Sequence, residues 1–171
     1  MIESILTGVS ASIAASLIFL WVLYNFKPKV EISPYIADQT IDGVHRYGFK
    51  IINKTKSTIF DIKVQALLIQ PVQVHGGPVS NVRELNLLKD HFFEMGPFDL
   101  KDADAHYALR FGTGDDIASL WSSNTEFLRV NVVSRHAFSG FSKVESFIFN
   151  TKGIIKEGKH EFGAGVEVKP A

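Results

Sequence analysis

The chain of 171 residues contains no cysteine, which excludes disulfide bonds, thiolate zinc sites and a cysteine nucleophile. It also lacks a surplus of either charge, because 18 acidic residues balance its 18 basic ones. A balanced chain offers no electrostatic footprint for a polyanion, so we expect no nucleic acid partner. A chain of this length allows one ordinary domain and a short appendage.

Recognised catalytic spacings are missing as well. The six histidines form no HExxH pair, and the serine of Ser139-Gly140 lacks the G-x-S-x-G elbow of hydrolases. The tightest polar group is Asp102-Ala-Asp104-Ala-His106, whose side chains would share one face if the segment were extended. We interpret them as solvated loop charges, since this spacing alone is a weak metal signal. We therefore expect no enzyme, no catalytic residue, no cofactor and no metal ligand.

Charge is absent from one long segment near the N-terminus, Ile5–Phe26. As a helix this segment is roughly 33 Å long, enough to cross a hydrocarbon core of about 30 Å. A signal peptide would have a basic start and a shorter apolar run, and a buried helix of a soluble domain would have a polar face. Here the start is acidic and the apolar run is long, and its second half, Ser16–Tyr24, has no polar face. The sequence predicts a short N-terminal tail over 1–4 and a transmembrane helix over 5–26.

Lysines follow this segment directly and predict its orientation. Lys27 and Lys29 favour the cytoplasmic side, which places the N-terminus outside and the following domain in the cytoplasm at the inner (plasma) membrane. Trp21 and Tyr24 occupy the place of an interfacial aromatic belt. Pro28 ends the helix, because it lacks an N–H donor and disfavours helical geometry at the preceding residue. Residues 27–29 are thus a juxtamembrane stop.

Small residues recur every four positions in the first half of the helix, at Gly8, Ser12 and Ser16. Such a face allows a neighbouring helix to approach closely, and serine hydroxyls can bond across the contact. The alternative is that small residues are simply common in membrane helices. The expected partners are the lipid bilayer and either another copy of the chain or another membrane protein.

Residues 30–171 change to a period of two, which is typical of strands. The predicted strands are Val30–Ile36, Tyr47–Asn53, Phe60–Val72, Val82–Leu88, His106–Phe111, Phe127–Ser134, Lys143–Phe149 and Phe162–Val168. A short helix is predicted over 115–122, where two aspartates precede apolar residues. About eight short strands with regular turns predict a mainly β domain, an antiparallel β-sandwich of immunoglobulin-like size.

Two aromatic residues, Phe138 and Phe141, lie at the turn of a predicted hairpin beside basic residues. Exposed aromatic side chains at this turn would mark a contact with a partner or a membrane. Alternatively, both rings are buried and close one end of the sandwich.

The order of these features resembles the inner helix and cytoplasmic domain of inward-rectifier potassium channels. The similarity rests on the apolar helix with KPK, on Phe49–Pro71, on Phe127–Phe162, and on an I-x-x-G-x-x-F element at Ile155, Gly158 and Phe162. It implies an immunoglobulin-like cytoplasmic domain of the E-set type and assembly around the helix. The chain departs from the family in having no outer helix and no T-[VI]-G-[YF]-G filter, so no carbonyl ring is available to replace the water shell of potassium.

We therefore predict a single-pass, membrane-anchored cytoplasmic β-sandwich that acts as a non-catalytic interaction or regulatory module. The alternative is a subunit of an oligomeric ion channel or pore, or an accessory chain to one.

Overall fold

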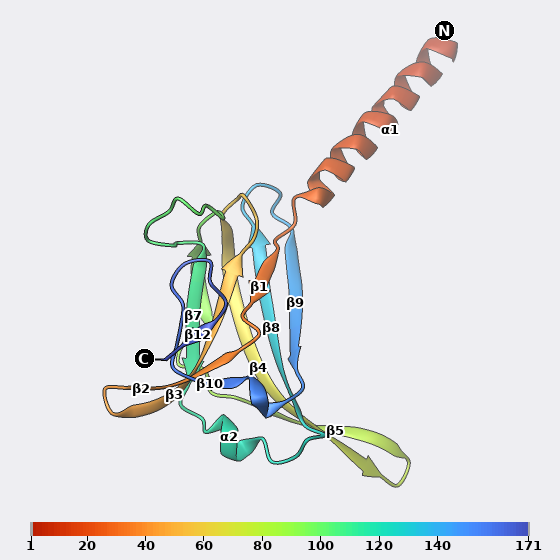
Figure 1. Ribbon diagram of the computed structural model, residues 1–171. Coiled ribbons are helices and arrows are strands. Elements are labelled where there is room, and N and C mark those ends of the chain that lie inside the picture. The colour runs from red at the N-terminus through yellow and green to blue at the C-terminus, as the bar shows by residue number, and fades with distance from the viewer. Residues whose placement is uncertain (1, 171) are drawn as a thin grey trace.

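A computed structural model describes residues 2–170, with side chains from residue 7 onward (Figure 1). A long helix, α1 (Ile2–Asn25), projects from a domain built almost entirely of strands. The helix begins three residues before the predicted span and ends one residue before its predicted end. Its final turn tightens, since the Phe26 N–H donates to the Leu23 carbonyl at 3.0 Å. Pro28 prevents further helical propagation.

Over residues 30–170, the structure describes twelve strands and two very short helical elements. Their bounds are β1 (Val30–Ile32), β2 (Ile36–Ile41), β3 (Val44–Asn53), β4 (Ile59–Val74), β5 (Gly77–Glu84), β6 (His91–Met95), β7 (Ala108–Thr113), α2 (Ile117–Leu120), β8 (Phe127–His136), β9 (Ser142–Phe149), η1 (Lys152–Ile154), β10 (Ile155–Glu157), β11 (Lys159–His160) and β12 (Val168–Lys169).

Two sheets make up the sandwich. In sheet A, β3 pairs antiparallel with β1 and β2 along one edge and with β7 along the other, and β10 adds a parallel pair to β2. In sheet B, β4 pairs antiparallel with β8 on one edge and with β5 and β6 on the other, and β9 completes the sheet beside β8. The small pair β11–β12 is separate from both.

The core lies between the two sheets and follows the alternation of their strands. Leu128, Val130 and Val132 of β8 are buried on one face, as period-two spacing requires. They share one apolar cluster with residues from sheet A, among them Phe49. Trp121, directly after α2, closes the cluster and is 1% exposed. The prediction of a mainly β protein with one N-terminal apolar helix and antiparallel sheets is confirmed.

The C-terminal segment departs from the predicted strand over 162–168. Instead of running straight, residues 158–169 fold over the outer face of sheet A as the pair β11–β12 with a turn between them. The reason is Lys50, which lies on this face and is 1% exposed. Its ammonium donates to the carbonyls of Glu161 at 2.6 Å and Gly165 at 2.5 Å, so the chain must bend to bring both oxygens to one point.

The predicted strand Val30–Ile36 is divided into β1 and β2. Ser33 and Pro34 interrupt it, because Pro34 lacks a ladder donor and the Ser33 hydroxyl donates to the Val166 carbonyl at 2.6 Å. Strand β6 was not predicted, because its five residues bury only Phe92 and Met95 and are too few to show a period.

Candidate functional site

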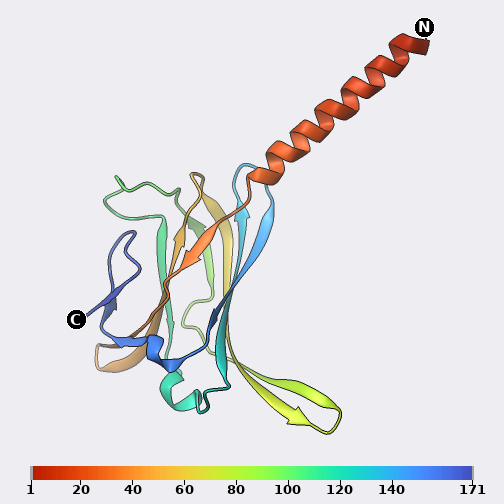
Figure 2. The same cartoon turned by 45° about the vertical axis from the view of Figure 1, so that its right-hand side comes forward.

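Three loops and the exit of α1 gather at one end of the sandwich, which we call the helix-proximal end. The loops span residues 54–58, 96–107 and 137–141, and the exit is the linker over 26–29. Figure 1 and Figure 2 both show these segments on the side of the domain where the helix leaves. The β4–β5 ribbon projects from the opposite end in both views. The predicted interface and contact residues of the domain therefore lie at one end.

The loop over 54–58 is the centre of the helix-proximal end, because it bonds to each of the other three segments through the backbone. These hydrogen bonds run from Lys54 N to the Lys29 carbonyl (2.8 Å), from Phe98 N to the Thr55 carbonyl (2.8 Å) and from Ala137 N to the Thr58 carbonyl (3.1 Å). One contact goes to the linker, one to the long loop and one to the β8–β9 turn. The position of the helix exit relative to the domain is thus set by hydrogen bonds.

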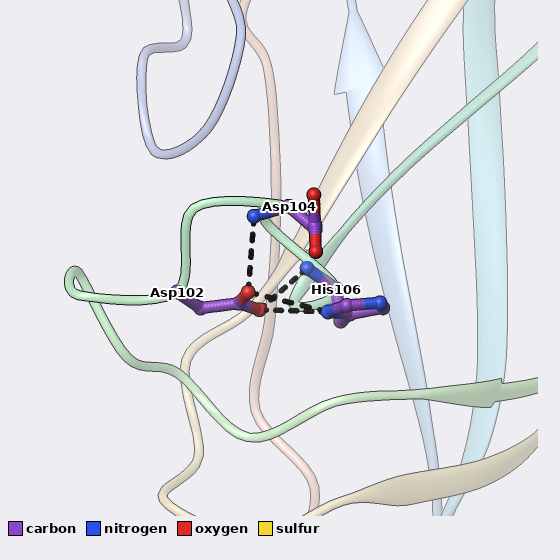
Figure 3. A group of neighbouring side chains, drawn as sticks. All are labelled: Asp102, Asp104 and His106. Atoms are coloured by element: carbon purple, nitrogen blue, oxygen red, sulfur yellow. Dashed lines mark hydrogen bonds and ion pairs between the residues drawn. The ribbon is translucent and has the colours of Figure 1, made fainter.

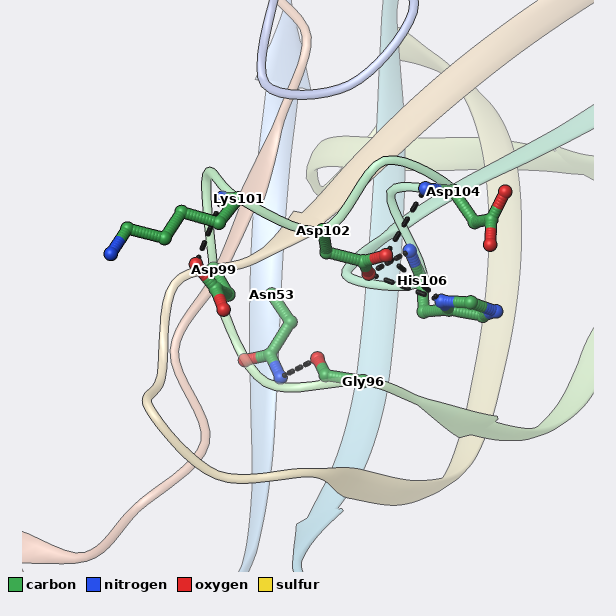
Figure 4. Close-up of polar contacts among 7 residues, drawn as sticks. All are labelled: Asn53, Gly96, Asp99, Lys101, Asp102, Asp104 and His106. Carbon is green, nitrogen blue, oxygen red and sulfur yellow. Dashed lines mark hydrogen bonds and ion pairs between the residues drawn. The ribbon is translucent and has the colours of Figure 1, made fainter.

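Asn53 orders this loop from inside and is fully buried. Its side-chain amide donates to the carbonyls of Ser57 at 2.8 Å and Gly96 at 2.7 Å (Figure 4). Its side-chain oxygen accepts from the backbone N–H of Thr55 at 2.9 Å and from the Thr55 hydroxyl. Both donors of the carboxamide and its acceptor are therefore satisfied, as burial of such a polar group requires.

This role of Asn53 was not predicted. The signal for its local part was present, because an asparagine two residues before Thr55 at the end of a strand is typical of an Asx turn. The contact with Gly96 joins residues 43 positions apart, and no local pattern indicates it.

The helix exit is held by the β8–β9 turn. The Ser139 hydroxyl donates to the Phe26 carbonyl at 2.5 Å, and the Phe26 ring lies 5.4 Å from the Phe138 ring and 5.8 Å from that of His136, between centroids. Pro28, two residues on, is buried. The four-residue linker is therefore packed against the domain, in contrast to a flexible tether.

The predicted interface residues lie on both sides of the helix end. Trp21 and Tyr24 are 69% and 63% exposed, and their spacing of three puts them on neighbouring positions of the helix surface. The Lys27 ammonium lies over the Tyr24 ring, 3.1 Å from its centroid. Lys29 is exposed. The aromatic rings and the two charges thus all lie within nine residues at the helix exit, and Lys27 contacts Tyr24 directly.

The two phenylalanines of the β8–β9 turn differ in their surroundings. Phe138 is 73% exposed, whereas Phe141 is partly buried and its carbonyl accepts from His136 N at 2.9 Å. Of the pair, Phe138 is the side chain available to an external surface.

The predicted association residues lie on one exposed face of α1. Gly8, Ser12 and Ser16 are all exposed, and nothing lies within 4 Å of the position a side chain would take at Gly8. The Ser12 hydroxyl donates to the Gly8 carbonyl at 3.0 Å, and the Ser16 hydroxyl to the Ser12 carbonyl at 2.8 Å. The face is therefore smooth, and its two hydroxyls have partners within the helix.

Asp102, Asp104 and His106 come together in the long loop, although the segment is not an extended strand. Their ligand atoms lie within 4.8 Å of one another (Figure 3). The loop curls around the Asp102 carboxylate, which accepts from Asp104 N at 3.1 Å, from His106 N at 2.8 Å and from the His106 ring at 3.1 Å. Partial burial raises the pKa of Asp102, but the hydrogen bonds outweigh burial and lower it below the ordinary value.

This arrangement closes a turn. Both carboxylate oxygens of Asp102 accept hydrogen bonds from backbone N–H groups of the same loop. The segment is a turn and not a strand, so the three side chains do not share a strand face. A hard divalent cation takes six or more oxygen ligands, whereas this cluster offers two carboxylates and one imidazole, two of the three exposed. We therefore assign the cluster a role in shaping the loop.

A serine and a histidine also meet at the β8–β9 turn. Ser139 Oγ lies 3.3 Å from His136 Nδ1, and this ring nitrogen accepts from Ser139 N at 3.2 Å. The hydroxyl proton of Ser139 is directed to the Phe26 carbonyl, and burial lowers the pKa of His136. These hydrogen bonds stabilise the turn and attach it to the helix exit. They do not form a nucleophile–base pair, because in such a pair the hydroxyl donates to the ring nitrogen.

Three basic side chains, of which Lys50 and His160 are buried, hold the C-terminal segment on sheet A. Burial and the nearby Arg110 together lower the pKa of Lys50 to about 8, against the opposite effect of Glu161. His160 Nε2 donates to the Gly48 carbonyl at 3.1 Å, and burial lowers the pKa of His160 to about 4. Arg110 donates to the carbonyls of His160 and Glu161. These contacts seal the outer face of sheet A.

Comparison of the chain with family models and with curated proteins finds no match.

Proposed function

We propose that the protein is a single-pass, membrane-anchored β-sandwich that acts as a non-catalytic interaction or regulatory module. One observation carries the proposal. The segment Thr7–Asn25 of α1 is long and apolar enough to cross a membrane, and none of it is buried against the domain. An apolar helix that packs on nothing in its own chain needs a lipid or protein environment, because its exposed side chains are costly in water.

The proposed orientation places the domain in the cytoplasm. Lys27 and Lys29 follow the apolar segment within four residues, and the N-terminal flank carries no basic side chain. Protease added to sealed spheroplasts tests the orientation. Survival of the domain, with digestion after lysis, is expected, and cleavage from outside would reverse the assignment. Alkaline carbonate extraction tests the anchor separately, since a chain released into the supernatant has no transmembrane helix.

We further propose that the sandwich is immunoglobulin-like, of the E-set type, as in the cytoplasmic domains of inward-rectifier channels. Two facing antiparallel sheets around one core support this proposal. The I-x-x-G-x-x-F element adds a second point. Gly158 has a φ of 128° in the turn between β10 and β11, which only glycine adopts readily, and its N–H donates to the Asp38 carbonyl at 2.9 Å.

We propose that partners bind at the far end of the domain. The inward stripe of β4, which includes Ala66 and Leu68, continues beyond the sandwich as Val72 and Val74, and Val79 pairs with Val72 on the same face. These three valines are 38%, 47% and 52% exposed. An isolated two-stranded ribbon is marginally stable in water, so contact with another protein surface would stabilise it. We call this surface the valine ribbon.

Self-association through α1 would place copies of the domain side by side. The smooth face at Gly8, Ser12 and Ser16 supports this arrangement. The cysteine-free chain allows a direct test in membranes. Ser12→Cys is expected to form a disulfide-linked dimer under oxidation, whereas Ala14→Cys, a small residue on the opposite face, is the matched control. Equal cross-linking at both positions would contradict association through this face.

The same face supports the alternative, a subunit of an oligomeric pore. Ion flux into liposomes that contain the purified protein separates the two functions. Flux that requires the protein would favour the pore, and its absence in cross-linkable oligomers would leave the interaction module. A monomer in detergent would eliminate a pore made of this chain alone.

A further inference from the structure

The β8–β9 turn lies beside the point where the proposed transmembrane helix leaves the bilayer. Ser139 bonds to the carbonyl of Phe26, which directly follows the last helical residue, Asn25. The distance of 2.5 Å means that the turn and the helix end share one level along the helix axis. Figure 1 shows the β8–β9 turn next to the lower end of α1. Any membrane boundary at the helix end therefore lies at the level of this turn.

An aromatic ring extends from the turn at this level. Phe138 is 73% exposed, and the only ring contact recorded for it among the described residues is with Phe26, 5.4 Å away. Phe26 is itself 41% exposed, and Tyr24 and Trp21 are exposed near the same end of the helix. Exposed aromatic rings around the end of a transmembrane segment match the interfacial belt in which such rings reside.

Charge distinguishes this side of the helix-proximal end from the other. Lys27, Lys29 and Lys56 surround the exit on the linker and the loop that bonds to it, and Lys29 and Lys56 are exposed. The loop over 96–107, by contrast, carries the acidic residues Asp99, Asp102 and Asp104 against one lysine, Lys101. Anionic head groups attract the basic side and repel the acidic one. The contact is therefore confined to the linker and the β8–β9 turn.

We propose that the β8–β9 turn is a second membrane contact, with Phe138 seated in the interfacial layer of the cytoplasmic leaflet beside anionic head groups. The proposal rests on the proposed transmembrane anchor. The hydrogen bond between Ser139 and Phe26 joins the transmembrane helix to the β8–β9 turn. Two linked membrane contacts give the domain a defined orientation, with the valine ribbon directed away from the lipid.

The absence of cysteine makes single-site labelling direct. The full chain is reconstituted into phosphatidylcholine vesicles that contain some phosphatidylglycerol, and a polarity-sensitive fluorophore is attached at one introduced cysteine. Ala137→Cys places the label beside Phe138 without removing it, Val79→Cys is the control at the far end, and Leu17→Cys reports on the anchor itself. Lipids with a nitroxide near the head group or deep in the chain then quench labels by depth.

The expected result is loss of fluorescence at Ala137→Cys with the shallow quencher, loss at Leu17→Cys with the deep quencher, and no loss at Val79→Cys. Adding Phe138→Ser is expected to reduce the quenching at Ala137→Cys and shift its emission to the red. If Leu17→Cys is quenched but Ala137→Cys behaves like Val79→Cys, the second contact is overturned and the anchor stands. If Leu17→Cys is not quenched, the anchor and this inference both fail. Quenching at Ala137→Cys that Phe138→Ser leaves unchanged would overturn the role of Phe138.

Discussion

The two ends of the sandwich are built in opposite ways from the same kinds of residue. At the helix-proximal end, three loops and a linker are joined by backbone hydrogen bonds around the buried side chain of Asn53. At the far end, β4 and β5 extend as a ribbon (Figure 2). The side chains of Val72 and Val79 on this ribbon are exposed. One end is organised around a buried and fully paired polar side chain, and the other extends as a ribbon with exposed valines.

The difference indicates that hydrogen bonds hold the helix-proximal end in place, whereas the exposed apolar surface of the ribbon is suited to contact with another molecule. A loop cluster next to the proposed membrane anchor must hold one position relative to the helix, and hydrogen bonds provide directional restraint. An extended apolar ribbon restrains little within its own chain, and its surface is typical of contact with another protein. The predictions below test this contrast, beginning with the largest expected effect.

Replacement of Asn53 by alanine should loosen the helix-proximal end. The change leaves the carbonyls of Ser57 and Gly96 and the N–H of Thr55 without their partner, and we expect a loss of about 4 kcal/mol in the free energy of unfolding. Denaturant unfolding of the full chain in detergent, followed by near-UV circular dichroism, measures it. The control is Asn81→Ala on the exposed ribbon strand β5, expected to change stability by less than about 0.5 kcal/mol. Equal effects at both asparagines would erase the contrast between the ends.

Acidification should lower the free energy of unfolding through protonation of His160, which lies between the two ends of the domain. Because burial lowers the folded-state pKa from 6.5 to about 4, the unfolded chain binds a proton in this interval that the folded chain does not. Stability should therefore fall as pH drops from 6.5 to 4, by up to about 3 kcal/mol from this residue.

The pH dependence is measured by unfolding at several pH values, and His160→Gln should flatten it. Glutamine retains an N–H donor for the Gly48 carbonyl and does not titrate in this range. His75→Gln, exposed at the ribbon turn, is the matched control and should leave the slope unchanged. A His160→Gln variant with the original slope would show that another group titrates.

Ser139→Ala should release the turn from the helix exit at a smaller cost. The variant loses the hydrogen bond to the Phe26 carbonyl, worth about 1 kcal/mol, and the longer one that Ser139 Oγ accepts from Phe141 N. Hydrogen exchange at residues 137–141 should accelerate more than global stability falls, because the loss is local. Ser80→Ala on the ribbon removes an exposed hydroxyl and serves as control. Unchanged exchange at the turn would show that the ring contact with Phe26 is sufficient to hold it.

The valine ribbon should tolerate polar substitution almost without loss of stability. The double variant Val72→Thr with Val79→Thr is expected to unfold within about 0.5 kcal/mol of the natural chain, since both side chains are exposed. The same change at buried Val130 should cost about 2 kcal/mol, because it places a hydroxyl in the core.

If the ribbon contacts a partner or a second copy, the double variant should also lower chemical cross-linking in membranes. Undiminished cross-linking would remove the valine ribbon from the interaction surface.

Several elements followed directly from sequence patterns. The uncharged run to Phe26 predicted α1 within a few residues. Alternation predicted β4 and a nearly continuous apolar run predicted β8, and their inner residues Val64 and Val130 are buried. These patterns extend over many residues. The segment 162–168 contains apolar residues without a sustained period. Its backbone conformation depends on the hydrogen bonds that the Lys50 ammonium donates to the carbonyls of Glu161 and Gly165.

The candidate site was predicted in part. Trp21, Tyr24, Lys27, Lys29 and Phe138 were named because apolar and basic residues near a helix end have known preferences. The sequence did not distinguish exposed Phe138 from partly buried Phe141, because both are aromatic residues in one turn. Phe141 is held in the turn by two hydrogen bonds: its N–H donates to Ser139 Oγ, and its carbonyl accepts from His136 N. Phe138 lies outside this pair of bonds and remains exposed.

The sequence by itself determined the properties that are local to the chain: an uncharged helix, its end before Pro28, and strands with one apolar face. Only the tertiary structure decided which distant segments meet, as Asn53 meets Gly96 and Ser139 meets Phe26. The physical reason is that side-chain periodicity is repeated along each element, whereas a hydrogen bond between remote loops depends on the path of all the chain between them. Packing of the two sheets sets that path, and with it the position of the helix on the domain.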